Sequence, residues 1–235
     1  RQGSYSIGCV SIDPKNPNVV WVGTGENNNQ RSVAYGDGVY KSVDGGASWK
    51  NMGLKSSEHI GNILIHPENS DIVYVSAYGP LWNKGGDRGI YKTIDGGKSW
   101  NKILFIDEHT GFNEIHMDPR NPDVLYATSH QRRRHVYTYV GGGPGSGIHK
   151  SVDGGNTWRK INKGLPGVEI GRIGMDISDA NPEVIYAIVE ASERKGGFYK
   201  STNRGESWQK QSSKVTSGNY YQEIFADPID VDVVY

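Results

Sequence analysis

One eight-residue motif occurs four times along the chain, and this repeat limits the possible folds more than any other feature. The copies read SVDGGASW, TIDGGKSW, SVDGGNTW and STNRGESW, and they align without gaps. They end at Trp49, Trp100, Trp158 and Trp208, so the spacings are 51, 58 and 50 residues. A fixed period of this length is typical of proteins that stack one supersecondary unit several times.

Two other markers keep the same period. A polar turn leads into an apolar segment at residues 13–21, 66–74, 118–126, 179–186 and 227–235. A Tyr-Lys or His-Lys pair precedes each eight-residue motif, at residues 40–41, 91–92, 149–150 and 199–200. Each period therefore predicts four short strands: an inner strand, a strand after the polar turn, a strand ending at the Lys-containing pair, and a strand beginning at the Trp. Four antiparallel strands per repeat form one blade of a β-propeller.

The predicted fold class is all-β, a β-propeller of four-stranded antiparallel blades, with about four and a half blades in the chain. The content of 32 Gly, 14 Tyr and 6 Trp agrees with many tight turns between short aromatic strands. We predict a single incomplete propeller domain over residues 1–235, with blades at about 6–53, 59–104, 111–163 and 169–211 and a half-blade at 220–235. A half-blade leaves an open edge, so we expect the remaining blades of a larger propeller, or a second chain, to cover it.

The repeated motif has the composition of a β-hairpin turn. Its glycines suit positions with positive φ, its Asp can accept hydrogen bonds from turn amides, and its Ser or Thr hydroxyl can close the other side. The fourth copy has Asn in place of Asp and Arg in place of the first Gly, and we expect its hairpin to persist. We therefore interpret these residues as structural: Asp44, Trp49, Asp95, Trp100, Asp153, Trp158, Asn203 and Trp208.

Charge and residue spacing exclude several classes of function. Lys plus Arg and Asp plus Glu number 26 each, so no overall field favours nucleic acid or an anionic membrane. No apolar stretch is long enough to span a bilayer, and we expect no membrane insertion. The single cysteine, Cys9, excludes an intrachain disulfide. The histidines lack metal-ligand spacing and no nucleotide-binding motif is present, so we predict no metal and no cofactor.

Long loops between the second and third strands of the blades are the expected location of function. They span residues 26–37, 78–88, 130–146 and 190–197, and long loops on a rigid scaffold commonly carry binding or catalysis. The candidate ligand contacts are aromatic and arginine side chains, which can stack on rings and pair with carboxylates: Trp82, Arg88, Arg132, Arg133, Arg134, Tyr137 and Arg172. Two alternatives stay open, since the run from Arg132 to Arg134 can be solvated or paired within the chain, and Trp82 can pin its own loop.

Carboxylates in the same loops and on the inner strands are the candidates for an acid and base pair. The first candidates are Glu26, Glu190 and Asp87, and the wider set adds Asp37, Glu114 and Glu223. A glycosidase needs two such carboxyl groups about 5 to 9 Å apart across a cleft, with one of them in an apolar setting that raises its pKa. A binding module has its aromatic and Arg side chains on an accessible rim instead, and its carboxylates are already paired.

The repeat resembles the Asp-box, or bacterial neuraminidase, repeat of a family of β-propellers. Segments 21–42, 79–93 and 131–139 are most similar to the large bacterial sortilin-like propellers, some of which are described as glycosyl hydrolases from the repeat alone. This resemblance implies an exported protein, located in the periplasm, at the cell surface or outside the cell. The sialidase arginine triad and the xyloglucanase Asp pair have no matching motif here. We expect a non-catalytic propeller that binds a protein, peptide or glycan, and a glycoside hydrolase is the alternative.

Overall fold

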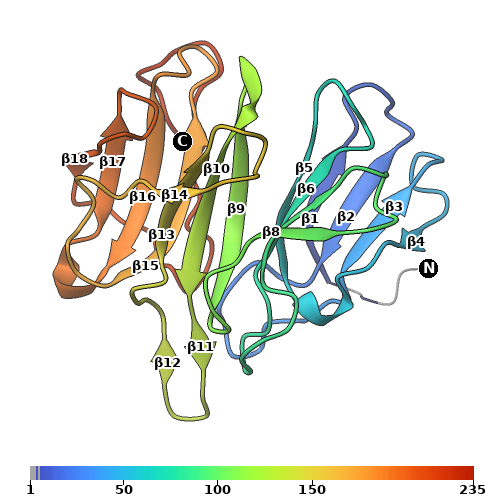
Figure 1. The fold of residues 1–235 in the computed structure, drawn as a ribbon. Helices are drawn as coiled ribbons and strands as arrows, with labels where there is room; N and C mark the ends of the chain where they lie inside the picture. The colour runs from blue at the N-terminus through green and yellow to red at the C-terminus, as the bar shows by residue number, and fades with distance from the viewer. Residues whose placement is uncertain (1–3, 5) are drawn as a thin grey trace.

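The computed structural model describes residue 4 and residues 6–235, and this part of the chain forms four sheets of four antiparallel strands each (Figure 1). Blade 1 contains β1 (Ile7–Ile12), β2 (Val20–Thr24), β3 (Val39–Ser42) and β4 (Lys50–Asn51). Blade 2 contains β5 (Ile60–Ile65), β6 (Val73–Ala77), β7 (Gly89–Thr93) and β8 (Asn101–Leu104). The strand order within each sheet follows the order in the chain.

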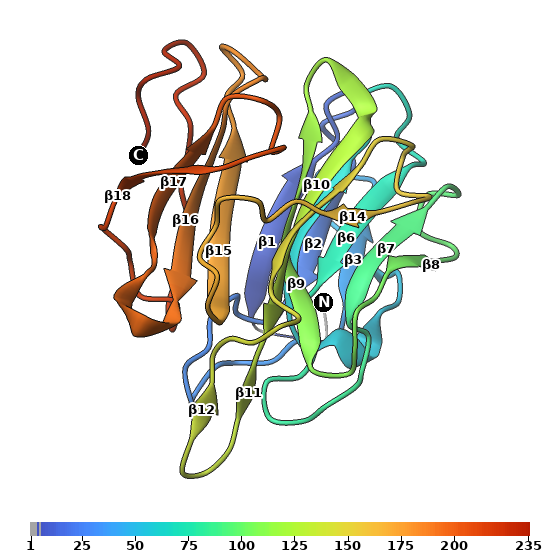
Figure 2. The same ribbon diagram turned by 60° about the vertical axis from the view of Figure 1, so that its left-hand side comes forward.

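Blade 3 contains β9 (Thr110–Asp118), β10 (Asn121–Gln131), β13 (Gly147–Ser151) and β14 (Arg159–Lys160). Its long loop carries an additional hairpin of β11 (Arg133–Arg134) and β12 (Tyr139–Val140), which extends beyond the blades in both ribbon views (Figures 1 and 2). Blade 4 contains β15 (Ile170–Ile177), β16 (Ile185–Ala191), β17 (Gly197–Ser201) and β18 (Gln209–Ser212). Two short 3₁₀ turns, η1 (Lys55–Ser57) and η2 (Ser192–Arg194), complete these elements. The prediction of an all-β partial propeller is confirmed.

The last part of the chain forms a hairpin rather than two full strands. Ala226 bridges Val234, and Phe225 and Tyr235 exchange two backbone hydrogen bonds of 3.0 and 2.8 Å. Ile224 of this segment packs against Val184 and Tyr186 of blade 4. This segment therefore lies next to blade 4 and continues the series of blades.

The hydrophobic core is divided into layers between successive blades. One layer joins blades 1 and 2 around Trp21, Ile63 and Val75, and further layers join blades 2 and 3 and blades 3 and 4. Trp100 belongs to the first of these layers, where its ring meets the Trp21 ring edge-on at 6.2 Å between centroids. Alternating side chains of each strand therefore face two different layers, as expected for strands between two neighbouring blades.

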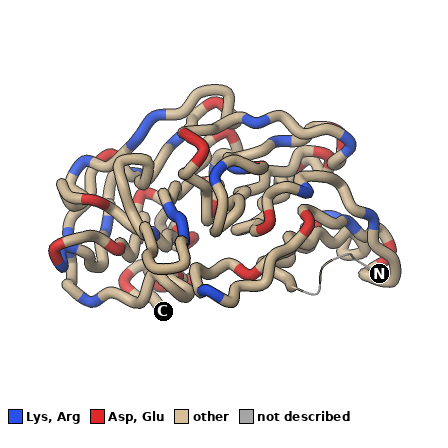
Figure 3. Tube along the Cα trace, turned by 90° about the horizontal axis from the view of Figure 1, so that it is seen from below, with Lys and Arg blue, Asp and Glu red and all other residues tan. Residues whose placement is uncertain are grey.

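The charged residues are mixed over the whole molecule. Segments of Lys and Arg are interspersed with segments of Asp and Glu when the trace is seen from below (Figure 3). This distribution agrees with the balanced composition, and neither sign of charge fills a whole side of the described trace in this view.

Candidate binding face and central cavity

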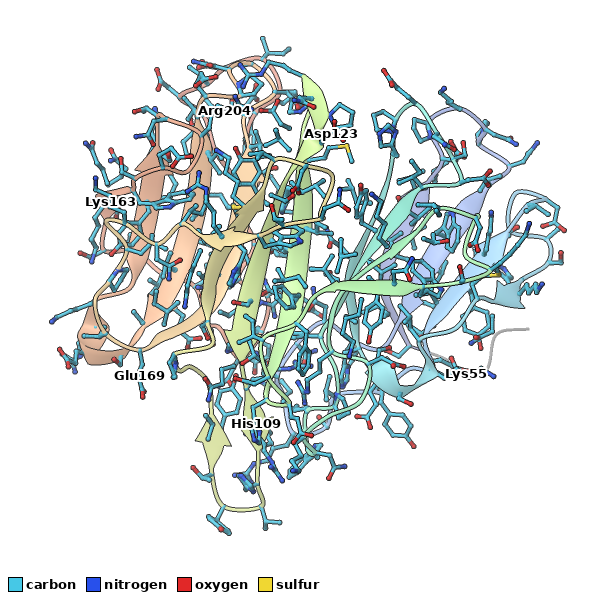
Figure 4. The ribbon with its side chains drawn as sticks, viewed as in Figure 1. Lys55, His109, Asp123, Lys163, Glu169 and Arg204 are labelled. Atoms are coloured by element: carbon cyan, nitrogen blue, oxygen red, sulfur yellow. The ribbon has the colours of Figure 1, made fainter. Side chains whose placement is uncertain are left out.

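The molecule has two ends that carry different structural features. Asp123 and Arg204 mark the end that carries the Asp-box hairpins, and His109 and Glu169 lie at the opposite end (Figure 4). The long loops and the β11–β12 hairpin project at this opposite end, which we call the long-loop end.

Each Asp-box carboxylate holds its own hairpin closed. Asp153 Oδ1 accepts hydrogen bonds from the amide of Thr157 at 2.8 Å and from the hydroxyl of Ser151 at 2.8 Å, and Oδ2 accepts from the Thr157 hydroxyl at 2.6 Å. Asp44 and Asp95 make the equivalent bonds. The hydroxyl of Thr157 and the other donors lower the pKa of Asp153 to about 2. Both oxygens of each carboxylate accept hydrogen bonds within the turn, so we interpret these acids as structural.

The fourth hairpin keeps the same geometry with different residues. Asn203 Oδ1 accepts from the Ser207 amide at 3.0 Å and from the Ser201 hydroxyl at 2.9 Å, and its Nδ2 donates to the Ser207 hydroxyl. Arg204 takes the left-handed position of the missing glycine, with φ of 58°, and its guanidinium donates to Asp118 at 3.0 Å.

At the long-loop end, one backbone segment is held by side chains from three blades. We call residues 26–29 the strap. Its four successive carbonyl oxygens accept hydrogen bonds from four side chains. His59 donates to Glu26 at 2.9 Å, Arg172 to Asn27 at 2.9 Å, Arg132 to Asn28 at 3.0 Å and Arg134 to Asn29 at 2.6 Å. The strap also reaches the segment after blade 4, because the Asn29 amide donates to the Asn219 carbonyl at 2.9 Å.

Most of the predicted ligand-contact arginines therefore lie inside the protein. Arg88, Arg132 and Arg172 are completely buried and Arg134 is nearly so, contrary to the expected accessible rim. Arg88 donates to the carbonyls of Tyr78, Pro80 and Asn83, and the Arg132 guanidinium stacks on the Tyr78 ring at 3.3 Å. Backbone carbonyls are neutral acceptors, so these hydrogen bonds satisfy guanidinium N–H donors without neutralising the positive charge. Their observed role is to connect loops.

Two buried histidines of this region are neutral. Burial, together with the charge of Arg132, lowers the pKa of both His59 and His130 to about 3. His130 Nε2 contacts the carbonyl of Gly141 at 3.1 Å, which can only accept, so this nitrogen carries the proton. His130 Nδ1 then accepts from the hydroxyl of Tyr78. Burial in a loop gives no signal in the sequence, so the neutral state of these two histidines follows only from the structure.

The aromatic candidates remain accessible. Tyr137, at the tip of the β11–β12 hairpin, is 87% exposed, and Trp82 is 37% exposed. The Arg134 amide donates to the Leu81 carbonyl at 2.9 Å, so the hairpin is joined to the loop that carries Trp82. The His135 and Tyr137 rings stack at 6.3 Å between centroids. The structure thus brings Trp82 and Tyr137 onto adjoining loops, while Arg133 is half-buried beside them.

The first three candidate carboxylates are separated from one another. Each accepts a hydrogen bond from a backbone amide in a different place: Glu26 from Ala34 at 2.8 Å, Asp87 from Ser56 at 2.9 Å, and Glu190 from Arg172 at 3.2 Å. Burial raises the pKa of Glu190. Asp37 accepts from the Tyr40 hydroxyl at 2.7 Å. Glu190 lines two cavities, one formed with residues 213–218 and one with residues 141–142, and neither lining includes Glu26, Asp37 or Asp87.

Glu114 and Glu223, by contrast, line the same cavity. It has a volume of about 370 Å³ and lies between the inner strands β1, β5, β9 and β15 and the segment at residues 223–225. Glu114 accepts from the Met175 amide at 2.8 Å and contacts His116 at 3.3 Å. Burial lowers the pKa of His116, but the hydrogen bond and the charges of Glu114 and Asp176 outweigh it, so the pKa is raised overall. We call this space the central cavity.

Within residue 4 and residues 6–235, no three His, Cys, Asp or Glu side chains are grouped so that they could hold a metal ion. Over the same residues, none of the helices has the length and apolar character needed to cross a bilayer.

Several known proteins are similar to this chain in sequence or in fold. A family model described as Sortilin, neurotensin receptor 3 matches residues 37–143. A xyloglucanase from Hypocrea jecorina (strain QM6a) is 26% identical over 195 residues, which cover 78% of this chain and 21% of the relative. A GH74 xyloglucanase structure from Xanthomonas campestris superposes with a TM-score of 0.71 at 14% identity, covering 96% of this chain and 34% of that one. The chain is an Asp-box β-propeller.

This propeller is similar to sortilin-like and glycosyl-hydrolase-type propellers, as the sequence motifs predicted. A second xyloglucanase, from Paenibacillus sp, is 26% identical over 191 residues, or 75% of this chain and 17% of the relative. The chain therefore spans about a fifth of the length of these curated relatives. The structural likeness at 14% identity establishes the fold alone.

Proposed function

We propose that this propeller binds a glycan without cleaving it, through the exposed aromatic side chains of its long-loop end. The observation that carries the proposal is the pair of adjoining loops that present Trp82 and Tyr137 to solvent. Aromatic rings with one exposed face suit the apolar faces of sugar rings. The xyloglucanase relatives support a glycan rather than a protein as the ligand class. The proposal includes export of the protein, which fractionation of its host cells tests.

The candidate carboxylates favour binding over hydrolysis. Glu26, Asp87 and Glu190 are each bonded to a backbone amide, and they are distributed over different loops. A glycosidase needs two carboxyl groups flanking one bond, with one free to donate a proton and the other free to attack or activate water. Residues whose oxygens serve to fix loop backbone are poorly suited to these roles.

A glycan array with a parallel hydrolysis assay tests the proposal, with xyloglucan oligosaccharides as the first probe. We expect binding without turnover, and a loss of affinity of about tenfold, or about 1.4 kcal/mol, in Tyr137→Ala or Trp82→Ala. Ile94→Ala removes an exposed apolar side chain of the second Asp-box hairpin and is the matched control, with unchanged binding expected. Turnover of any glycan, or equal binding by all three variants, would contradict the proposal.

A glycoside hydrolase is the second candidate, because Glu114 and Glu223 share one cavity. Partial burial, together with the negative charge of Glu114, raises the pKa of Glu223, as expected for a general acid. The deciding variant is Glu223→Gln in a protein that shows turnover: complete loss of hydrolysis would establish this candidate, and unchanged hydrolysis would exclude it.

A further inference from the structure

The central cavity offers mainly hydrogen-bond acceptors to whatever enters it. Its lining includes the carboxylates of Glu114, Asp176 and Glu223, and among the described residues that line it only His116 can become cationic. The inner strands β9 and β15 run from the long-loop end towards the Asp-box end, so His116 and Asp176 lie nearer the Asp-box end than Asn113 does. Asn27 of the strap also lines the cavity, which places the strap at its long-loop end.

The three carboxylates differ in the hydrogen bonds and ion pairs that they already make. Asp176 accepts from the amides of Ile177 and Ala226, both at 2.9 Å. Glu114 is bonded to the Met175 amide and to His116. Glu223 has no hydrogen bond or ion pair among residue 4 and residues 6–235. Its charge interacts at longer range with Arg172, which does not line the cavity, and with Glu114, which repels it.

Two buried amides add unused acceptors at the same place. Asn113 is completely buried and Asn27 is more than nine-tenths buried, and both line the cavity. Asn113 Nδ2 donates to the Ile173 carbonyl at 2.7 Å, and Asn27 Nδ2 donates to the Gly61 carbonyl at 3.5 Å. Their Oδ1 atoms accept no hydrogen bond from the described residues. A buried acceptor without a donor is costly, so a donor-rich group at the cavity wall would stabilise both amides once their side chains rotate to turn the oxygens towards it.

The remaining wall is apolar. Cys9, Met175, Ile224 and Phe225 line the cavity beside the acceptors. A ligand that matches this lining has an apolar stem and a cationic head with several donors. A guanidinium group fits best, because its five N–H donors lie in one plane and can reach separate acceptors, whereas it accepts nothing. We propose that the central cavity binds the arginine side chain of a peptide, with Glu223 as its ion-pair partner and Asn113 and Asn27 as further acceptors.

Titration with Nα-acetyl-arginine amide, followed by NMR of the whole chain, tests this site. The citrulline analogue has the same shape without the charge and is the matched ligand control. We expect resonances of β9, β15 and residues 223–225 to shift with the arginine probe and to stay unchanged with citrulline. Glu223→Gln should weaken binding about tenfold, because the ion pair is lost while the side-chain shape is kept. Glu68→Gln, an exposed carboxylate in a turn of blade 2, should leave binding unchanged.

The outcomes separate the alternatives clearly. Equal responses to arginine and citrulline, or unchanged affinity in Glu223→Gln, would overturn the proposal. Glu223 makes no bond that holds the fold, so the variant is expected to fold, and its amide spectrum checks this. Neither Trp82 nor Tyr137 lines the central cavity, so glycan binding and arginine binding can each fail without the other.

Discussion

At the residue scale, the lysine of each Lys-containing pair connects its blade to the next. Lys92 donates to the Gly154 carbonyl in the Asp-box of blade 3 at 2.8 Å, and Lys150 donates to the Arg204 carbonyl of blade 4 at 2.8 Å. Lys92 also lies over the Tyr74 ring at 5.2 Å, so the aromatic residue after the polar turn and the lysine serve one contact. Three markers keep one period because they meet at each boundary between blades.

The Asp-box carboxylates make the stability of the fold depend on acid pH. The pKa of Asp153 is lowered to about 2 in the folded chain, against about 3.9 for a free Asp. The contribution of the Asp-box carboxylates to the free energy of unfolding is therefore complete above about pH 4 and is lost as the pH falls towards about 2. We expect the melting temperature to fall over this range, and to fall less in Asp153→Asn, which copies the natural Asn203. Thermal scans between these pH values check this, and an identical decline in the variant would contradict it.

At the element scale, the strap shows why a cluster of buried arginines exists in loops. A strap of four consecutive polar residues has few backbone partners of its own, and side chains of three blades supply them. These contacts fix the long-loop end as one unit, from blade 1 to the segment after blade 4. The arginines thereby position the exposed aromatic loops without contacting solvent themselves.

Neighbouring arginines provide a matched test of this role. Arg132→Met removes donors to the carbonyls of Asn28 and Gly79 and leaves them buried without partners. We expect the free energy of unfolding to fall by about 3 kcal/mol, because each unsatisfied buried group costs roughly 1–3 kcal/mol. Arg133→Met, at the half-buried adjacent position, should change it by less than about 1 kcal/mol. Urea unfolding measures both, and equal effects would show that Arg132 does not hold the strap.

The sequence predicted the blades well because each repeat encodes a local unit. Glycine pairs, the Asp and the Trp recur at fixed spacing, and the hydrogen bonds of the Asp side chain lie within four residues of it. The candidate site depended on contacts between distant residues instead. Arg132 and Asn28 are over a hundred positions apart, and nothing in a run of arginines distinguishes a surface patch from buried donors. Glu114 and Glu223 differ from this case, because the repeat predicts both at the starts of inner strands, and in the structure both line one cavity.

At the scale of the whole molecule, a blade is stabilised by the apolar layers packed on its two faces. Blade 1 differs because apolar side chains on one of its faces are exposed. Val10 and Ile12 of β1 are 60% and 59% exposed, whereas their equivalents in β5, Ile63 and Ile65, are buried against blade 1. The register confirms the equivalence, since Ile12 pairs with Val20 and Ile65 with Val73. The same strand position therefore contributes differently to stability in the two blades.

Ile65→Ala and Ile12→Ala measure this difference directly. Truncation of a buried Ile costs roughly 2–5 kcal/mol through lost transfer free energy and the cavity left behind, so Ile65→Ala should destabilise the chain by an amount in this range. Ile12→Ala should change the free energy of unfolding by no more than about 0.5 kcal/mol, because its side chain is already in water. A comparable loss in both variants would mean that the outer face of blade 1 is covered in solution. That result would identify the sheet formed by β1 to β4 as an interface, and the same two variants would then report on whatever covers it.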